Sequence, residues 1–180
     1  MAKWVKLILL VALSIVAFLG VIVSQKMSVE EVVDMRLNMD YEILHMEEIE
    51  NKTIVLASVG NGDAQFVIVK RGLLANLAIY DGTFTDLDFV LNKIGIYFFE
   101  VPKSHMDNKL ICFGFIEKDA VSSLTLSDQM DASNAKITNL DEYAFWIADA
   151  TNIKMRQIII NGYDAESKQV LEYEEILKGN

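Results

Sequence analysis

Most of the side chains in this chain that could do chemistry are carboxylates. The densest group lies in the stretch DGTFTDLD, where Asp81, Asp86 and Asp88 are candidate calcium ligands. Hard cations favour clustered carboxylates and loop carbonyls. The spacing of Asp86 and Asp88 begins a D-x-D pair, but valine and leucine follow where an EF-hand loop has a third ligand and a glycine. We therefore interpret the stretch as a polar turn, with a calcium site as the alternative, and expect no cofactor.

Two carboxylates facing each other across a cleft could also hydrolyse a glycosidic bond. The candidate pairs are Asp86 and Asp88 near Asp81, or the adjacent Asp141 and Glu142. The chain has 26 acidic residues, so some carboxylates will be close by chance, and most keep the surface solvated. We expect no catalytic residue, and a carboxylate-dependent hydrolase of the cell envelope is the alternative.

The two histidines and the single cysteine match no metal or nucleophile motif. His45 lies in the partly apolar EILHMEE and is interpreted as a hydrogen-bonded structural residue, whereas His105 is expected in a solvated loop. The chain has no H-x-H, H-E-x-x-H, C-x-x-C or G-x-S-x-G motif. Cys112 stands between Ile111 and Phe113. A reactive thiol needs an accessible, electropositive setting, so this cysteine is expected to be a small core residue.

Aromatic side chains are the remaining candidates for binding. The adjacent pairs Phe98–Phe99 and Phe145–Trp146 must point to opposite faces if they lie in strands. The simplest explanation is that both faces of the sheet are covered, so that the aromatic side chains on each face are part of the core. The alternative is an exposed patch for a protein partner, formed by Phe99, Phe113 and Trp146.

An apolar run of 17 residues, Leu7 to Val23, dominates the N-terminus. As a helix it would be about 25 Å long, near the lower limit for crossing a hydrocarbon core. Lysines flank the run and the first acid comes only at Glu30, so the positive-inside rule places the N-terminus inside and the rest outside. Residues expected to form this anchor include Trp4, Leu7, Leu10, Phe18 and Val23.

A cleaved signal peptide is the competing interpretation of residues 1–26. Its apolar region normally has about 7–15 residues and ends at an A-x-A-like site. The run here is longer, and Ile22-Val23-Ser24 lacks the small residue that such a site needs. The sequence therefore favours a retained anchor in residues 1–26 and an extracytoplasmic β-rich domain in residues 27–180.

Charge is distributed unevenly along the chain. Three of the 16 basic residues and none of the 26 acidic residues lie in residues 1–26. Residues 27–180 thus carry 13 basic and 26 acidic residues, a net charge of −13. Such a surface repels nucleic acid and anionic headgroups, so no nucleic-acid partner is expected. The single cysteine allows no internal disulfide.

The pattern after the run predicts one helix followed by strands. Ser28 and Glu31 form a capping box before apolar residues at helical spacing, which predicts a helix from about 29 to 38. Turn signals then separate short β runs. The predicted hairpins pair residues 52–59 with 64–70, 95–101 with 110–117, and 155–161 with 169–173; a turn is predicted at Asp81-Gly82, and residues 143–148 are expected to form a strand.

These elements predict an α+β fold that is mainly antiparallel β, as a sandwich or a partly open barrel, with one leading helix and a preceding transmembrane helix. The order of features, with the stretches Asn51 to Val59, Cys112 to Ile116 and Ile158 to Leu171, resembles small uncharacterised membrane-anchored extracytoplasmic proteins of low-GC Gram-positive bacteria. The resemblance implies no catalytic residue.

Together, the sequence predicts a single-pass protein of the cell membrane that acts as a binding or accessory module with a protein partner and without catalytic activity. A structural subunit of a membrane complex is a further alternative. In that case small or polar residues of the run, such as Ser14 and Gly20, would face another helix.

Overall fold

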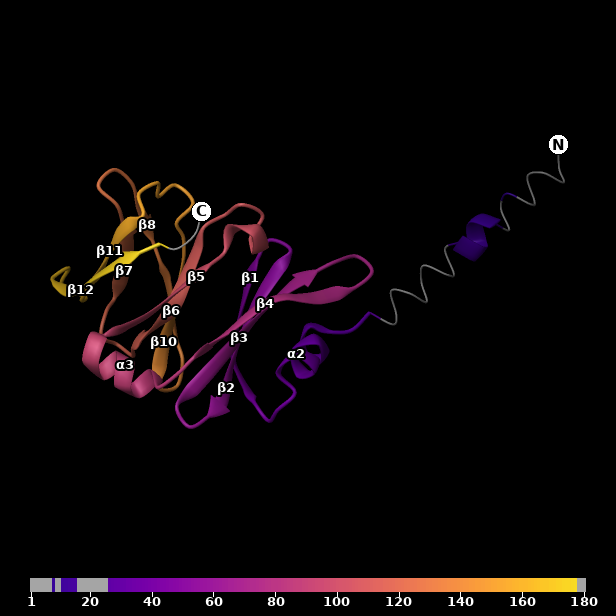
Figure 1. Cartoon of the computed structure of the whole chain (residues 1–180), viewed down its shortest axis with the longest axis horizontal. Helices are drawn as coiled ribbons and strands as arrows, with labels where there is room; N and C mark the ends of the chain where they lie inside the picture. The colour runs from indigo at the N-terminus through magenta and orange to yellow at the C-terminus, as the bar shows by residue number, and fades with distance from the viewer. Residues whose placement is uncertain (1–7, 9–10, 16–25, 178–180) are drawn as a thin grey trace. The chain divides into compact units, whose positions relative to one another are not determined.

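The computed structural model describes residues 8, 11–15 and 26–177 (Figure 1). Residues 8 and 11–15 are helical. The residues expected to form the membrane anchor, Trp4, Leu7, Leu10, Phe18 and Val23, lie outside the described part. Among the residues that are described, none of the helices has the length and apolar character needed to cross a membrane.

The chain divides into two compact units. The first comprises the chain up to Ala57 together with Gln65–Gly82, and the second comprises Ser58–Ala64 together with the chain from Thr83 onward. The division runs through the turn of one hairpin and through one strand, so no linker separates the units. The sequence, which shows no composition shift after residue 27, gives no sign of this division.

The first unit begins with helix α2 (Val29–Leu37). Its capping box is present as predicted: the Glu31 amide donates to Ser28 Oγ at 3.1 Å, and the Ser28 amide donates to Glu31 Oε2 at 2.6 Å. These bonds satisfy two of the amides that a helix start leaves unpaired. Asn38 ends the helix in the left-handed conformation.

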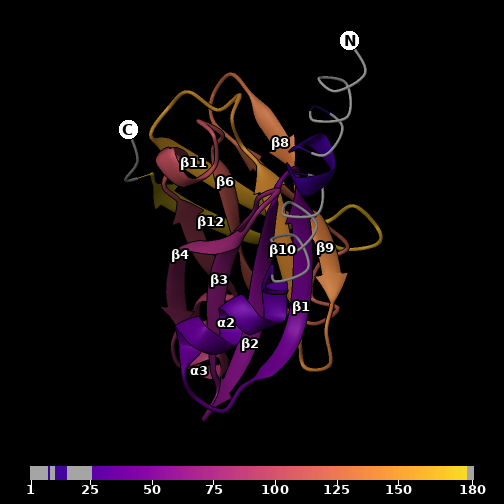
Figure 2. The ribbon, with the colours of Figure 1, turned by 90° about the vertical axis from the view of Figure 1, so that its right-hand side faces the viewer.

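Four strands follow in the order β1-β2-β3-β4. They are β1 (Glu42–Ile49), β2 (Lys52–Gly60), β3 (Asp63–Arg71) and β4 (Asn76–Phe84). In Figure 2, α2 lies across this sheet. Val32, Val33 and Leu37 of the helix share a core cluster with alternate residues of the two central strands, namely Val55, Ala57, Val67 and Val69.

Strand β4 corrects the predicted turn at Asp81-Gly82, because the strand continues through both residues to Phe84. Asp81 accepts a hydrogen bond from Arg36 Nε at 2.9 Å, and the Arg36 Nη2 donates to the same oxygen. β4 is an edge strand with an exposed face, where a polar side chain with a partner is tolerated. Position at the edge of the sheet thus outweighs the local turn propensity.

The second unit contains two four-stranded antiparallel sheets. Their orders are β5-β6-β10-β9 and β12-β11-β7-β8. The strands are β5 (Ile96–Val101), β6 (Ile111–Glu117), β7 (Ser123–Ser127), β8 (Ala132–Asn134), β9 (Lys136–Asn139), β10 (Tyr143–Asp149), β11 (Gln157–Tyr163) and β12 (Gln169–Ile176); a 3-10 turn, η1, covers Lys103–His105.

The prediction of a mainly antiparallel β fold is confirmed, as are the three predicted hairpins, and none of the three sheets closes into a barrel.

The predicted leading helix is confirmed as α2, but a second helix, α3 (Leu87–Ile94), was not predicted. It occupies part of the stretch interpreted as a polar turn. Leu87 and Leu91 are buried one helical turn apart, which is the spacing of an amphipathic helix. The sequence shows this spacing, but Asp86 and Asp88 favoured the interpretation as a polar turn. The helix is also only eight residues long, so its pattern is short.

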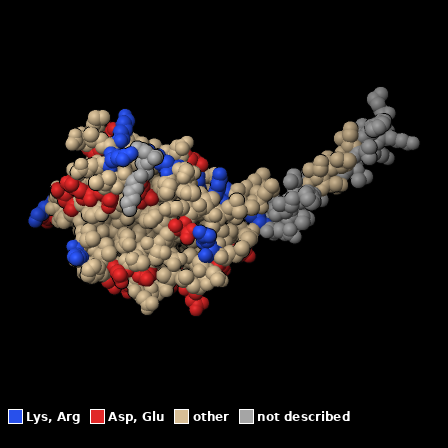
Figure 3. All heavy atoms as spheres, in the orientation of Figure 1, with Lys and Arg blue, Asp and Glu red and all other residues tan. Residues whose placement is uncertain are grey.

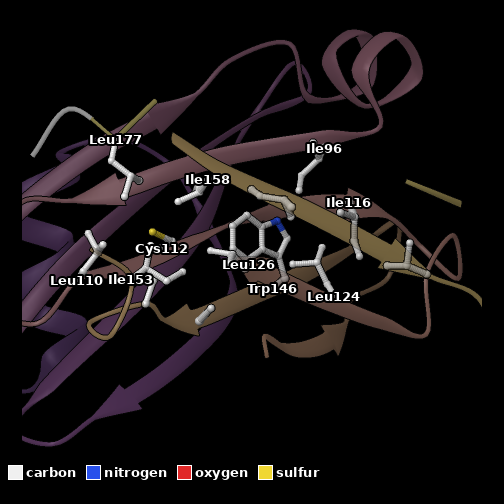
Figure 4. Packing of buried hydrophobic residues seen from close by; sticks show 14 of the residues in the cluster. Ile96, Leu110, Cys112, Ile116, Leu124, Leu126, Trp146, Ile153, Ile158 and Leu177 are labelled. Carbon is white, nitrogen blue, oxygen red and sulfur yellow. The ribbon is translucent and has the colours of Figure 1, made fainter. Parts of the chain in front are cut away.

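Trp146 is at the centre of the core between the two sheets of the second unit (Figure 4). The strand register places it opposite Gly114 on β6, and Gly114 is also opposite Phe98 on β5. The rings of Phe98 and Trp146 stack with centroids 6.0 Å apart. Gly114 leaves the space in which these two large side chains meet.

Candidate functional site

Two of the three calcium candidates are engaged by another side chain. Asp81 is bonded to Arg36, and Asp88 accepts a hydrogen bond of 2.6 Å from the Tyr143 hydroxyl. Desolvation, reinforced by Asp88, raises the pKa of Tyr143 to about 12. Asp86 precedes α3 in the left-handed conformation and does not cap it. Within the described ranges, no three or more His, Cys, Asp or Glu side chains are grouped so that they could hold a metal ion.

The alternative of an exposed partner patch formed by Phe99, Phe113 and Trp146 is wrong. Phe113 and Trp146 have no exposed surface, and Phe99 is half-buried. The strand register also puts Phe99 and Phe113 on one face of the sheet and Trp146 on the other. On the first face, the edge of the Phe84 ring meets Phe113 and its neighbours. The aromatic residues are therefore core on both faces of this sheet.

Cys112 is fully buried, as expected for a core residue. Burial raises the pKa of its thiol far above the ordinary value, and Glu100 and Asp149 raise it further. An anionic environment is the opposite of what activates a cysteine. His45 is partly buried and its Nε2 lies 3.2 Å from Glu47 Oε2, which agrees with a hydrogen-bonded structural histidine.

The second unit has a surface hollow of about 380 Å³ at the edge of its core. It is lined by Asp119, Val121, Ser122, Ile137 and Asn139. Asn139 Nδ2 donates to the only carboxylate among them, that of Asp119, at 3.4 Å. A glycosidase needs two carboxyl groups on either side of the bond, so these lining residues do not supply that machinery.

Asp128 joins two loops of the second unit. Its Oδ1 accepts from the amides of Met130 and Asp131 at 2.7 Å each, and its Oδ2 accepts from those of Lys154 and Met155 at 3.0 Å each. These four backbone donors, that of Met155 above all, hold the pKa of the carboxyl well below its ordinary value. A carboxylate held ionised in this way ties loops together and is unsuited to donate a proton.

The surface feature that sequence reasoning missed is an apolar hairpin tip. The β3–β4 hairpin exposes Leu73 and Leu74 in its connection and Leu77 near the start of β4, with relative exposures of 83%, 49% and 60%. We call these three residues the leucine tip. Turns in soluble proteins favour Gly, Asn, Asp, Ser and Pro, so the sequence GLLANLA at a turn was itself a signal.

The hairpin holds the leucine tip in a defined position. The Gly72 amide donates to the Ala75 carbonyl at 2.9 Å. A Cβ on Gly72 would lie 2.5 Å from that carbonyl oxygen, so only glycine fits without a shift of the turn. At the base, Arg71 Nη1 lies 2.6 Å from Glu48 Oε1 and its Nη2 donates to the Glu50 carbonyl at 2.8 Å.

The leucine tip lies beside the start of the first folded unit. Asn76, within the tip sequence, donates from Nδ2 to the Met27 carbonyl at 2.9 Å. Figure 1 shows the β3–β4 hairpin extending beyond the sheet on the side where the chain joins α2. Two segments 49 residues apart in sequence are thereby held together.

The charge near the tip differs from that of the rest of the molecule. From residue 70 to residue 80 the only charged side chains are Lys70 and Arg71, and Lys26 precedes Met27. Elsewhere, Asp and Glu side chains are dispersed over the visible face and separated by uncharged surface (Figure 3). At the base of the hairpin, Arg71 pairs with Glu48 and donates to the Glu50 carbonyl.

No protein-family model matches the chain, and no match to it was found among curated proteins or solved structures.

Proposed function

We propose that this protein is a single-pass, membrane-anchored binding or accessory module without catalytic activity. In this proposal the N-terminal run crosses the cell membrane with its N-terminus inside. The β-rich units lie outside, close to the bilayer, and recognise a protein partner there.

The hydrogen bond between Asn76 and Met27 supports this proposal best. It fixes the chain at Met27, four residues after Val23, the end of the apolar run. Four extended residues reach at most about 14 Å. A run that spans the bilayer would therefore hold Met27 within that distance of the hydrocarbon core and the first unit beside the membrane.

The environments of the acidic residues also favour binding over catalysis. Glycosidic hydrolysis needs one carboxyl group whose pKa is raised so that it can donate a proton. Asp81 instead pairs with an arginine, and Asp128 accepts four backbone amides. The four amides stabilise the ionised form of the Asp128 carboxyl, and both arrangements suit a structural role.

The topology is tested by a reporter fused after Asn180 in the full-length protein, read together with the N-terminal sequence of the mature chain. We expect an external reporter, an intact N-terminus and resistance to alkaline extraction. A cytoplasmic reporter, or release by alkaline washing, would refute the proposal.

The binding role is tested by crosslinking in intact cells through a photoreactive residue in place of Phe89, which is 63% exposed on α3, or of Met130, which is 71% exposed in the loop between β7 and β8. Photoreactive residues in place of the buried Phe113 and Phe145 are matched controls. We expect a discrete protein adduct from an exposed position and none from the buried ones. Turnover of an envelope substrate by the purified protein, without any adduct, would show that the accessory role is wrong.

A further inference from the structure

We propose that the leucine tip enters the interface of the same bilayer that the N-terminal run crosses, so that the protein contacts its membrane at two points. This inference rests on the proposed membrane anchoring. It adds a second attachment, made by Leu73, Leu74 and Leu77, which fixes the orientation of the first unit.

The first reason is the exposure of these side chains. The β3–β4 hairpin exposes three leucines within five residues, by 83%, 49% and 60%, in and beside a turn where chains usually carry polar residues. Exposed apolar side chains grouped in this way mark a site of contact with a partner or a membrane. The turn is also ordered by the Gly72–Ala75 hydrogen bond, so the leucines are presented on a fixed scaffold.

The second reason is distance. Met27 lies within about 14 Å of the end of the apolar run, and the headgroup region on each side of the hydrocarbon core is about 5–8 Å thick. Asn76 is bonded to Met27, and Leu74 is only two residues from Asn76. The tip is therefore within reach of the bilayer whenever the run spans it.

The third reason is local charge. Lys26, Lys70 and Arg71 flank the tip, and basic side chains at this level interact favourably with lipid phosphates. The net charge of −13 over residues 27–180 repels anionic lipid, and Arg71 is already paired with Glu48. Apolar transfer of the leucines is thus the main driving force, and we expect contact with neutral lipid as well as anionic lipid.

Space favours lipid over a protein as the occupant. An α-helix with its side chains is about 10–12 Å wide, so between the tip and the bilayer there is room for little more than one helix. The tip is also a convex turn, whereas a docking site for a protein segment is usually a groove or an open strand edge.

The test uses full-length protein reconstituted in phosphatidylcholine vesicles, with or without phosphatidylglycerol. Leu74→Cys carries an environment-sensitive fluorophore, and Met39→Cys is the matched control. Met39 is 50% exposed, is also apolar, and belongs to the same unit. It follows the far end of the nine-residue α2, about 13 Å long. The native Cys112 is buried and stays unlabelled.

We expect a blue-shifted emission at position 74 and several-fold stronger quenching by spin-labelled lipid than at position 39, in both kinds of vesicle. Equal quenching at the two positions would overturn the inference. Flotation of the same samples after an alkaline wash separates the two proposals: protein that floats but shows no quenching at position 74 contradicts only the tip, whereas protein that does not float contradicts the anchor. Protection of position 74 in native membranes but not in pure lipid vesicles would assign the tip to a protein and also overturn the inference.

Hydrogen exchange provides a second measurement that needs no label. In vesicles the amides of residues 72–76 should exchange several-fold more slowly in the wild type than in a variant with both Leu73→Ser and Leu77→Ser. Both side chains are exposed, so their loss leaves the core intact. Unchanged protection in the double variant would count against insertion.

Discussion

Replacing Gly114 with alanine should sharply destabilise the second unit. Gly114 lies on β6 between β5 and β10, opposite Phe98 and Trp146. A Cβ at this position would lie 1.8 Å from the Tyr97 carbonyl oxygen and 3.2 Å from Trp146 Nε1. The first distance involves backbone of the neighbouring strand, so no side-chain rotation can relieve it.

The magnitude follows from which atoms must move. Adding a methylene to a packed core costs about 1–3 kcal/mol when side chains can adjust. Here β5 must shift and the stacked rings of Phe98 and Trp146 must separate, so we expect a loss of about 3 kcal/mol or more in the free energy of unfolding. Gly60→Ala is the matched control, because a Cβ there meets nothing within 4 Å and only its positive φ of 85° opposes the change. That strain costs about 1–2 kcal/mol.

The assay is guanidinium unfolding of the full-length protein in detergent micelles, followed by near-UV circular dichroism. The buried Trp146 and its aromatic neighbours give the signal for the second unit. Both variants and the wild type are compared at equal detergent concentration. If Gly114→Ala is no more destabilising than Gly60→Ala, the close approach of the two strands is not what requires glycine, and the reasoning fails.

Three further predictions concern local features. Ser28→Ala removes one half of the capping box and should lower the stability of α2 by about 1 kcal/mol, measured as faster amide exchange in the helix; exchange as slow as in the wild type would contradict the cap. Asp128 has a lowered pKa when folded, so its contribution to stability is complete above the unfolded value of about 3.9 and is lost as the pH falls below it. Asp128→Asn should therefore be less stable than the wild type at neutral pH and should lose less stability on acidification. Identical unfolding curves of the two proteins from neutral pH to pH 3 would show that Asp128 does not stabilise the two loops. Because burial raises the pKa of Cys112, a thiol reagent should modify it only on unfolding, and rapid labelling of the native protein would show that the core is open.

The hairpins were predictable because their signals are local. Asn61-Gly62 tolerates positive φ, and both residues adopt it in the β2–β3 turn. Alternation of apolar residues sets which face of a strand is buried, and Leu124 and Leu126 of β7 are both buried as their spacing requires. The capping box at Ser28 was predictable because it is also a local signal: its two partners are three residues apart.

The errors arose where distant contacts outweighed local propensity. Asp81-Gly82 reads as a turn, but Arg36 pairs with Asp81 and the strand continues. Helix α3 is short, and its burial of Leu87 and Leu91 depends on the sheets around it. The proposed aromatic patch failed because burial of Phe113 and Trp146 is set by the layers that cover each face of the sheet, which alternation alone does not specify.

By itself, the sequence determined the class of the fold, the leading helix, the hairpin turns and the buried character of Cys112, because each depends on neighbours along the chain or on side-chain period. It also carried the apolar N-terminal run on which the proposed anchoring rests. Only the tertiary structure decided that Asp81 and Asp88 bond to different partners, and that Gly114 makes room for Trp146. It also decided that the leucine tip lies beside Met27. These facts depend on residues tens of positions apart, and only the folded chain brings them within hydrogen-bonding or van der Waals distance.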